Sequence, residues 1–416
     1  MSGALQLLLR RRAFRRLWLG NVVSQLGDWV GWVAVAMVAL HEGGGPLDVA
    51  LVFAAHHLPA AALAPVAGVV ADRVDRRRLL WGTSVVLGLL TVGMAVAAAA
   101  GALGVLQLLL LTRSAGVAFF TPAERAALPR VVEKDELLLA GAFDAASWSV
   151  MFAVGMAAGG AMSLLGPSLA LAIDAGTFGV SALLFLGLPR IEPERTAQRP
   201  RLLRGISDAL AFTWPRPALR RAVFGKTPYA VAGGAAWIGL ALQADALGGA
   251  ALGGLGFGLL HAVRGIGTGV GPVLVAQRVR RGADVTSMWR AAYWLGLCGT
   301  AAVGFASGPW ALVLASLVWG LGGGSNWVVS TEQMQRHTPD WILARTSALD
   351  QIGMTVGMTL GVMGVALAVD AGFGLGVGML GAVVPAGVGW LLLDRAANAG
   401  TVAPCEGFDT AWDRSA

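Results

Sequence analysis

The chain has 416 residues, of which 56% are hydrophobic and 13% are charged, whereas an ordinary soluble domain carries roughly 25% charged residues. So few charges cannot coat the surface of the three soluble domains that the length alone would suggest, and the composition indicates a polytopic helical membrane protein. The two cysteines, Cys298 and Cys405, fit neither a disulfide framework nor a metal-ligand spacing, so no metal site is expected.

In chain order, twelve apolar runs are long enough to cross a bilayer, which takes about 20 helical residues. We expect the spans at 17–40, 48–71, 79–100, 103–122, 138–164, 167–188, 222–244, 251–276, 287–307, 309–331, 344–368 and 373–393. The sequence therefore predicts an all-α membrane protein with twelve transmembrane helices.

The Lys and Arg residues alternate from loop to loop. Of the 31 Lys and Arg residues, all but two precede the first span, follow the last span, or lie near the connections after spans 2, 4, 6, 8 and 10. The connections on the opposite side of the membrane have none. By the positive-inside rule, both termini are expected in the cytoplasm and the protein in the inner (plasma) membrane. Topology thus accounts for the net charge of +7, and no nucleic-acid partner is expected.

The chain divides into two six-span halves, which is typical of a duplicated transporter. We expect an N-terminal half at 1–188, a cytoplasmic loop with an amphipathic helix at 189–221, a C-terminal half at 222–395 and a polar tail at 396–416. A weak repeat supports duplication: Asp144 and Gly155 recur 206 residues later as Asp350 and Gly361.

One loop carries a recognisable motif. Between spans 2 and 3, Gly68, Asp72, Arg73, Arg76 and Arg77 match G-x-x-x-D-R-x-x-R-R, which resembles the loop signature of the major facilitator superfamily. The resemblance implies a fold of two pseudo-symmetric six-helix halves that works by alternating access. It also implies that these five residues form a conformational gate on the cytoplasmic side.

A second stretch narrows the branch. Residues 118–137, with Pro122 and Pro129, and the Ala-Ile-Asp-Ala sequence around Asp174 resemble the transmembrane secretion effector branch, which includes macrolide-efflux and siderophore-exporter proteins. The resemblance implies a proton-coupled exporter. Span 5, however, lacks the proline of the antiporter G-P-x-x-G-G motif, so the direction of transport stays open between export of a drug-like molecule and import of a metabolite.

Two charges lie deep in the spans. Asp28 lies about 16 Å from the cytoplasmic end of span 1, on a polar stripe with Asn21 and Gln25, and Arg113 lies about 14 Å into span 4. In the superfamily both spans line the central cavity. Since a buried charge needs a partner, we expect Asp28 and Arg113 to pair for proton coupling, the alternative being a fixed structural ion pair.

Four further charges are secondary candidates. Asp144 and Asp350, near the cytoplasmic ends of spans 5 and 11, are expected either to cap helix ends or meet loop arginines, or to act in gating or as a second proton site. Asp174 is either structural or functional. Arg264, in span 8, has no evident partner and is expected to contact either an anionic group of the substrate or a carboxylate.

Deep polar, aromatic and flexible residues are expected to line the substrate cavity. They are Asn21, Gln25, Trp32, Trp237, Trp319, Asn326, Met354 and Met358.

We therefore expect a secondary transporter that exchanges an amphipathic small molecule for protons. No phosphate-binding glycine loop followed by lysine and no nucleophile–base pair is evident, so neither an enzyme nor a cofactor is expected. The expected partners are the substrate, protons and the lipid bilayer, with the monomer as the working unit. A membrane scaffold or receptor that transports nothing is the other class of function, but it would not need charges such as Asp28 and Arg113.

Overall fold

The computed structural model describes residues 7–43, 45–71, 73–133, 136–192 and 202–399, and within these ranges the regular structure is entirely helical. The first half contains α2 (Arg12–Val38), η1 (Ala39–Gly43), α3 (Pro46–Ala71), α4 (Arg76–Ala99), α5 (Leu103–Val131), α6 (Leu137–Ser163) and α7 (Pro167–Leu186). The second contains α8 (Leu202–Thr213), α9 (Pro217–Phe224), α10 (Lys226–Arg280), α11 (Val285–Phe305), α12 (Pro309–Arg336), α13 (Asp340–Asp370) and α14 (Leu375–Ala399).

These helices confirm the expected all-α membrane fold. Within the described ranges, eleven helical segments are long and apolar enough to cross a membrane, and α10 contributes two of them. The chain reverses inside α10 at Gly249, whose φ of 57° is accessible mainly to glycine. The one expected span outside these eleven, the ninth at 287–307, corresponds to α11, which carries Arg290 and packs against α12 and α14.

Two boundaries differ from expectation. Helix α5 continues to Val131, nine residues past the expected end of span 4 at residue 122, since Ala123 and Ala127 on its extension are fully buried. The segment expected from residue 222 begins earlier, at Pro217, and consists of α9 followed by the first part of α10, with Gly225 between the two helices.

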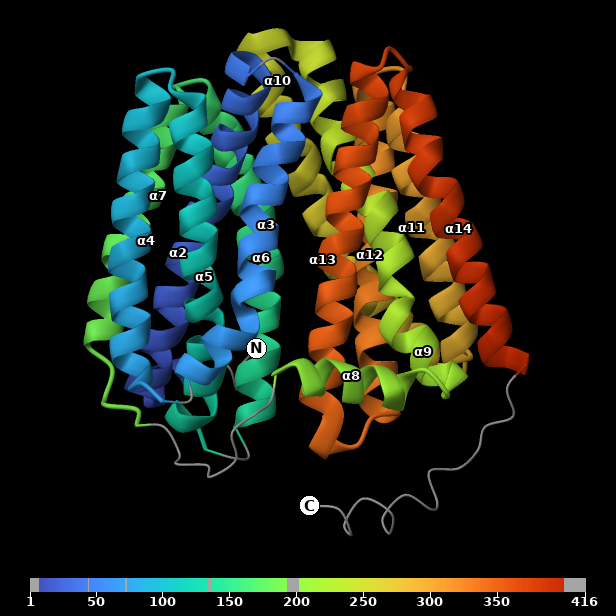
Figure 1. Cartoon of the computed structure of the whole chain (residues 1–416), viewed down its shortest axis with the longest axis horizontal. Coiled ribbons are helices and arrows are strands. Elements are labelled where there is room, and N and C mark those ends of the chain that lie inside the picture. The colour runs from blue at the N-terminus through green and yellow to red at the C-terminus, as the bar shows by residue number, and fades with distance from the viewer. Residues whose placement is uncertain (1–6, 44, 72, 134–135, 193–201, 400–416) are drawn as a thin grey trace.

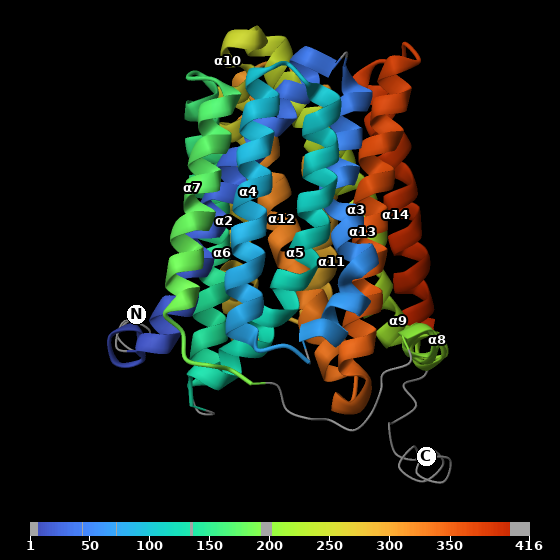
Figure 2. The same ribbon diagram turned by 60° about the vertical axis from the view of Figure 1, so that its left-hand side comes forward.

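The helices form two lobes side by side (Figure 1). The N-terminal lobe contains α2 to α7, and the C-terminal lobe contains α10 to α14. Helices α8 and α9 lie at the end of the bundle where α2 begins and α14 ends, here called the basic end (Figures 1 and 2). The other end, which holds η1 and Gly249, is called the η1 end.

Short polar contacts order the basic end. Asp284 caps α11: the backbone amide of Ser287 donates to its carboxylate at 2.7 Å, and this hydrogen bond holds the pKa of Asp284 below its usual range. The expected amphipathic helix is α8, which packs against α13 through buried Ala209 and a 3.1 Å ion pair between Asp208 and Arg345.

Small residues join the lobes on the side of the η1 end. Where α6 crosses the second span of α10, a Cβ at Gly160 would lie 3.0 Å from the carbonyl oxygen of Leu255 and 3.1 Å from Gly258 Cα. Glycine therefore allows the two backbones to touch, as it does in many membrane bundles. Near the η1 end, His41 Nε2 and Asp245 Oδ1 form a hydrogen bond of 2.7 Å between the lobes.

Candidate functional site

The deepest charged cluster lies inside the N-terminal lobe. Arg113 on α5 is buried, and its Nη2 atom pairs with Asp28 on α2 and, at 3.3 Å, with Asp174 on α7. Its Nε atom donates to Thr91 Oγ1 on α4 at 3.1 Å. Four helices thus meet at one guanidinium, and the structure brings Asp28, Arg113 and Asp174 together as a charged triad.

The two acids of this triad differ in access to solvent. The Asp28 side chain is 35% exposed, whereas that of Asp174 is 2% exposed. Asp174 lies against α2 where the helix has glycines, since a Cβ at Gly31 would lie 2.7 Å from one of its carboxylate oxygens. Of the two carboxylates, that of Asp28 is therefore the more accessible.

The net charge of the triad depends on the protonation of its two carboxylates. With both carboxylates ionised, Asp28, Arg113 and Asp174 together carry a net charge of −1, which is costly inside a membrane protein. One added proton makes the group neutral, and in such a coupled pair the proton belongs to both carboxylates. The arrangement is therefore suited to taking up and releasing one proton.

A polar cluster lies nearer the basic end of the same lobe. The buried Asn21 on α2 donates one amide group to Glu124 on α5 at 3.0 Å and to Asp144 on α6 at 3.2 Å. Sequence reasoning missed Glu124 because span 4 was expected to end at residue 122. The continuation of α5 to Val131 brings its carboxylate into the helix bundle.

The C-terminal lobe has a matching cluster. Lys226 on α10 pairs with Asp350 on α13 at 2.7 Å and donates to Thr331 on α12 at 2.9 Å. Lys226 and Asp350 are offset by 205 and 206 positions from Asn21 and Asp144, as the internal repeat predicts. The charge pattern alone groups Lys226 with the cations near the connection after span 6, although its position inside the expected span 222–244 indicates burial.

Aromatic side chains from both lobes meet where α10 packs against α2 and α6. Trp237 on α10 lies 6.1 Å from Trp32 and 6.5 Å from Trp29 on α2, between ring centroids, and 6.2 Å from Phe152 on α6. Trp32 and Trp237 were expected in the cavity, whereas Trp29 and Phe152 were not anticipated.

Arg264 lies in this aromatic group. Its guanidinium carbon is 4.1 Å from the ring centroid of Trp319, 5.0 Å from that of Trp237 and 5.1 Å from that of Phe152. One turn earlier, His261 stacks on Trp237 at 3.9 Å. Sequence reasoning missed His261, although its three-residue spacing from Arg264 places both on one face of the helix.

The other expected cavity residues have varied surroundings. Gln25 is half-buried, and its Oε1 atom has no hydrogen-bond partner among the described residues. Asn326 is buried in the C-terminal lobe, where it accepts a 2.7 Å hydrogen bond from Trp289. Met354 is half-buried, and Met358 packs against the hydrophobic core shared by the lobes.

The loop motif contacts its own lobe. Asp75 caps α4 and accepts a 3.1 Å hydrogen bond from the amide of Ile191, while the buried Arg76 donates to the carbonyl of Glu192 at 3.1 Å. Gly68 lies in the last turns of α3, Arg73 is exposed and Arg77 half-buried; Asp72 lies outside the described residues.

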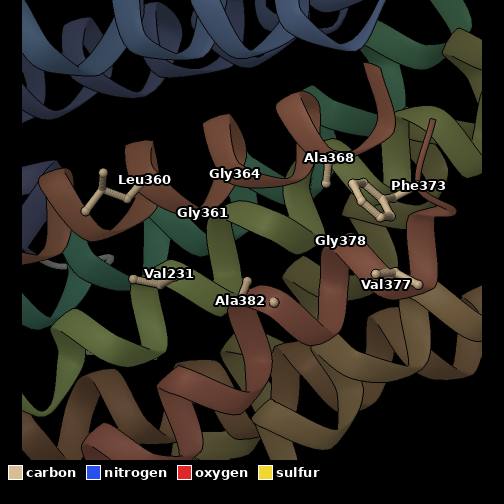
Figure 3. A pocket seen from close by; sticks show the side chains of 10 residues that line it. Val231, Leu360, Gly361, Gly364, Ala368, Phe373, Val377, Gly378 and Ala382 are labelled. Atoms are coloured by element: carbon tan, nitrogen blue, oxygen red, sulfur yellow. The ribbon is translucent and has the colours of Figure 1, made fainter. Parts of the chain in front are cut away.

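A cavity of about 310 Å³ lies within the C-terminal lobe, between α10, α13 and α14 (Figure 3). Glycines and apolar side chains line it, among them Val231, Leu360 and Phe373. None of the charged residues described above borders it, so it is separate from the two polar clusters and from Arg264.

Comparisons with known proteins agree with this architecture. The family model described as transmembrane secretion effector matches residues 6–394. The chain is 26% identical over 218 residues to the uncharacterized MFS-type transporter YkuC of Bacillus subtilis, covering 52% of this chain and 48% of YkuC. It is 29% identical over 206 residues to the multidrug efflux pump Tap of Mycolicibacterium fortuitum, covering 47% and 50%.

These alignments span about half the length of the curated relatives. Among solved structures, the nucleoside transporter NupG matches with a TM-score of 0.73 at 14% identity, covering 92% of this chain and 99% of NupG. At that identity the match shows the fold alone.

Proposed function

Because the chain belongs to the transmembrane secretion effector family of MFS-type transporters, we propose that it exports an amphipathic small molecule from the cytoplasm in exchange for protons. The family and its relatives are transporters rather than enzymes, with a small molecule and the lipid bilayer as partners. The observation that carries the proposal is the charged triad, in which two carboxylates share the one guanidinium of Arg113.

The triad supplies the proton step of the proposed cycle. A proton reaches Asp28 from water and neutralises the excess charge that Asp28 and Asp174 hold around Arg113. Because Arg113 links α2, α5 and α7, a change in its ion pairs alters how these three helices are held together. Protonation thereby favours one arrangement of the N-terminal lobe over another.

The aromatic group supplies the substrate step. Trp29 and Trp32 lie one and four residues after Asp28 on α2, and both contact Trp237 of the other lobe. A molecule bound between these rings touches both lobes and the helix that carries the proton acceptor. Substrate and proton thus act on the same rigid element, which is the physical requirement for coupling.

Alternating access then follows from the contacts between the lobes. In this arrangement the Gly160–Gly258 crossing and the His41–Asp245 pair hold the lobes together on the side of the η1 end. We propose that the basic end faces the cytoplasm of the plasma membrane and that the loop with Arg73, Arg76 and Arg77 closes it in the opposite state. The proton gradient drives the cycle in a monomer, without a cofactor.

Flux in everted vesicles tests this proposal. A compound panel on a pump-deleted host first selects a protective compound, and its accumulation is then followed after the vesicle lumen is made acidic. We expect gradient-driven accumulation by the wild type, its loss in Asp28→Asn, and normal flux in the matched control Asp208→Asn. Flux of the opposite sign, or full activity in Asp28→Asn, would contradict the proposal.

A further inference from the structure

Arg264 differs from the other deeply placed cations in its partners. Arg113, Arg221 and Lys226 each pair with a carboxylate, at Asp28, Asp394 and Asp350 respectively. Within the described part of the chain, no acidic side chain lies within ion-pair distance of Arg264, and its guanidinium faces aromatic rings instead. The faces of aromatic rings attract a cation but carry no negative charge that would neutralise it. Its location inside a membrane span therefore leaves this site with an uncompensated positive charge.

The neighbouring polar groups are donors as well. Arg264 Nη1 lies 3.4 Å from His261 Nδ1, and since a guanidinium only donates, Nδ1 accepts and the ring proton resides on Nε2. Both His261 Nε2 and Trp237 Nε1 are buried, and neither has a hydrogen-bond partner among the described residues. His261 is fully buried and Trp237 is 7% exposed. Buried donors without acceptors are costly, so their grouping around Arg264 points to a missing acceptor.

We propose that Arg264, His261 and Trp237 bind the anionic group of the transported molecule. The substrate is therefore an amphipathic organic anion, an inference that rests on the proposed function. A carboxylate or phosphonate supplies the negative charge that Arg264 lacks and acceptor oxygens for its fork of N–H donors. The faces of Trp319 and Phe152 take the apolar part of the molecule. An ammonium group at this position is repelled by Arg264.

The position of the site connects binding to movement. Arg264, His261, Trp237 and Trp319 belong to the C-terminal lobe, whereas Phe152 lies on α6 of the N-terminal lobe. An anion that draws the guanidinium away from its rings weakens an inter-lobe contact. Binding at Arg264 therefore acts on the interface that alternating access opens and closes.

A matched ligand series on the purified full chain tests the substrate class without a proton gradient. The probes are 2-naphthoate and 1-pyrenebutyrate, each compared with its carboxamide and with a primary amine on the same ring, and binding is measured as the rise in Tm. We expect the carboxylates to bind at least about tenfold more tightly than the carboxamides, since a charge-assisted bond contributes about 1.5–3 kcal/mol. The amines are expected to give no rise in Tm.

Variants assign that preference to Arg264. Arg264→Gln is expected to remove the difference between carboxylate and carboxamide, and Arg264→Lys to keep the preference at lower affinity. Arg281→Gln, at the exposed C-terminal end of the same helix, is the control and is expected to behave as the wild type. If Arg264→Gln fails to fold, His261→Ala replaces it and is expected to reduce the preference for the carboxylates, whereas an unchanged preference in that variant would overturn the proposal.

The proposal is overturned if the carboxylates leave the wild-type Tm unchanged, if the amines stabilise it equally, or if Arg264→Gln retains the preference for carboxylates. These outcomes concern equilibrium binding, so they are distinguishable from failure of the proposed proton exchange. That failure is observed only as flux that does not respond to a pH gradient.

Discussion

Trp32 and Trp237 lie 205 positions apart in the sequence, and their ring centroids lie 6.1 Å apart where the two lobes meet. Each also contacts a histidine of its own lobe, His56 at 4.7 Å and His261 at 3.9 Å, and these histidines are 205 positions apart as well. The two halves therefore contribute matching Trp–His pairs to the centre of the molecule.

The charges around this symmetric centre have diverged. The N-terminal lobe carries two carboxylates around Arg113, and the C-terminal lobe carries Arg264 without a described carboxylate partner. This difference in charge is the basis for proposing proton exchange at the N-terminal lobe and anion binding at the C-terminal lobe.

The buried pair between Lys226 and Asp350 is expected to stabilise the fold. Lys226→Met leaves Asp350 ionised without a partner, which costs about 3–5 kcal/mol for a buried pair. Thermal and denaturant unfolding of the purified protein measure the loss, and Lys226→Met combined with Asp350→Leu is expected to recover most of it. The control Arg345→Ala breaks an exposed pair and is expected to cost less than about 1 kcal/mol. An equal loss of stability in Lys226→Met and Arg345→Ala would contradict the expected difference between the buried and the exposed pair.

Asp174→Asn is expected to uncouple transport from the proton gradient. The substitution leaves Asp28 and Arg113 as a balanced pair, so the triad no longer gains from taking up a proton. Flux driven by a pH gradient should fall about tenfold or more, while exchange of labelled for unlabelled substrate continues. Exchange and gradient-driven flux that fall together would indicate a purely structural role for Asp174.

Gly160→Leu is expected to open the η1 end. A side chain at this position meets the backbone of α10 and forces the two lobes apart. Spin labels at Leu164 and Leu252, both exposed near this end, report the separation in a chain with Cys298→Ala and Cys405→Ser. We expect the distance distribution to shift outward by several ångströms, and an unchanged distribution would exclude the crossing as a gate.

Asp245→Asn is expected to shift the same equilibrium less. The side chains of His41 and Asp245 are 28% and 32% exposed, so their pair contributes at most about 1 kcal/mol, which is about a fivefold change in population. The same pair of spin labels measures the change. A shift as large as that of Gly160→Leu would show that the His41–Asp245 contact, rather than backbone packing, holds this end together.

The proposed exchange of an anion for a proton is expected to depend on the membrane potential. One anion leaving while one proton enters moves two elementary charges in the same electrical direction, which corresponds to about 4.6 kcal/mol per 100 mV. Current from proteoliposomes on a solid-supported membrane should therefore follow the potential when 1-pyrenebutyrate is the substrate. Electroneutral exchange of that compound would contradict the stoichiometry.

The sequence by itself determined the architecture. Long apolar runs form helices in a bilayer, because every backbone polar group must be paired within the segment. The alternation of arginines among the loops then indicates the number of membrane crossings. It also indicated that Asp28 and Arg113 have similar depth, since depth depends only on the rise per residue. The motif around Gly68 and the stretch at 118–137 identified the family.

Only the tertiary structure decided which charges meet. Helix rotation and packing between distant spans set the neighbours of a buried side chain, and neither follows from hydropathy. The structure therefore added Asp174 to the Asp28–Arg113 pair and brought Lys226 to Asp350. It also surrounded Arg264 with rings from both lobes, since those contacts depend on how two separately folded bundles approach each other.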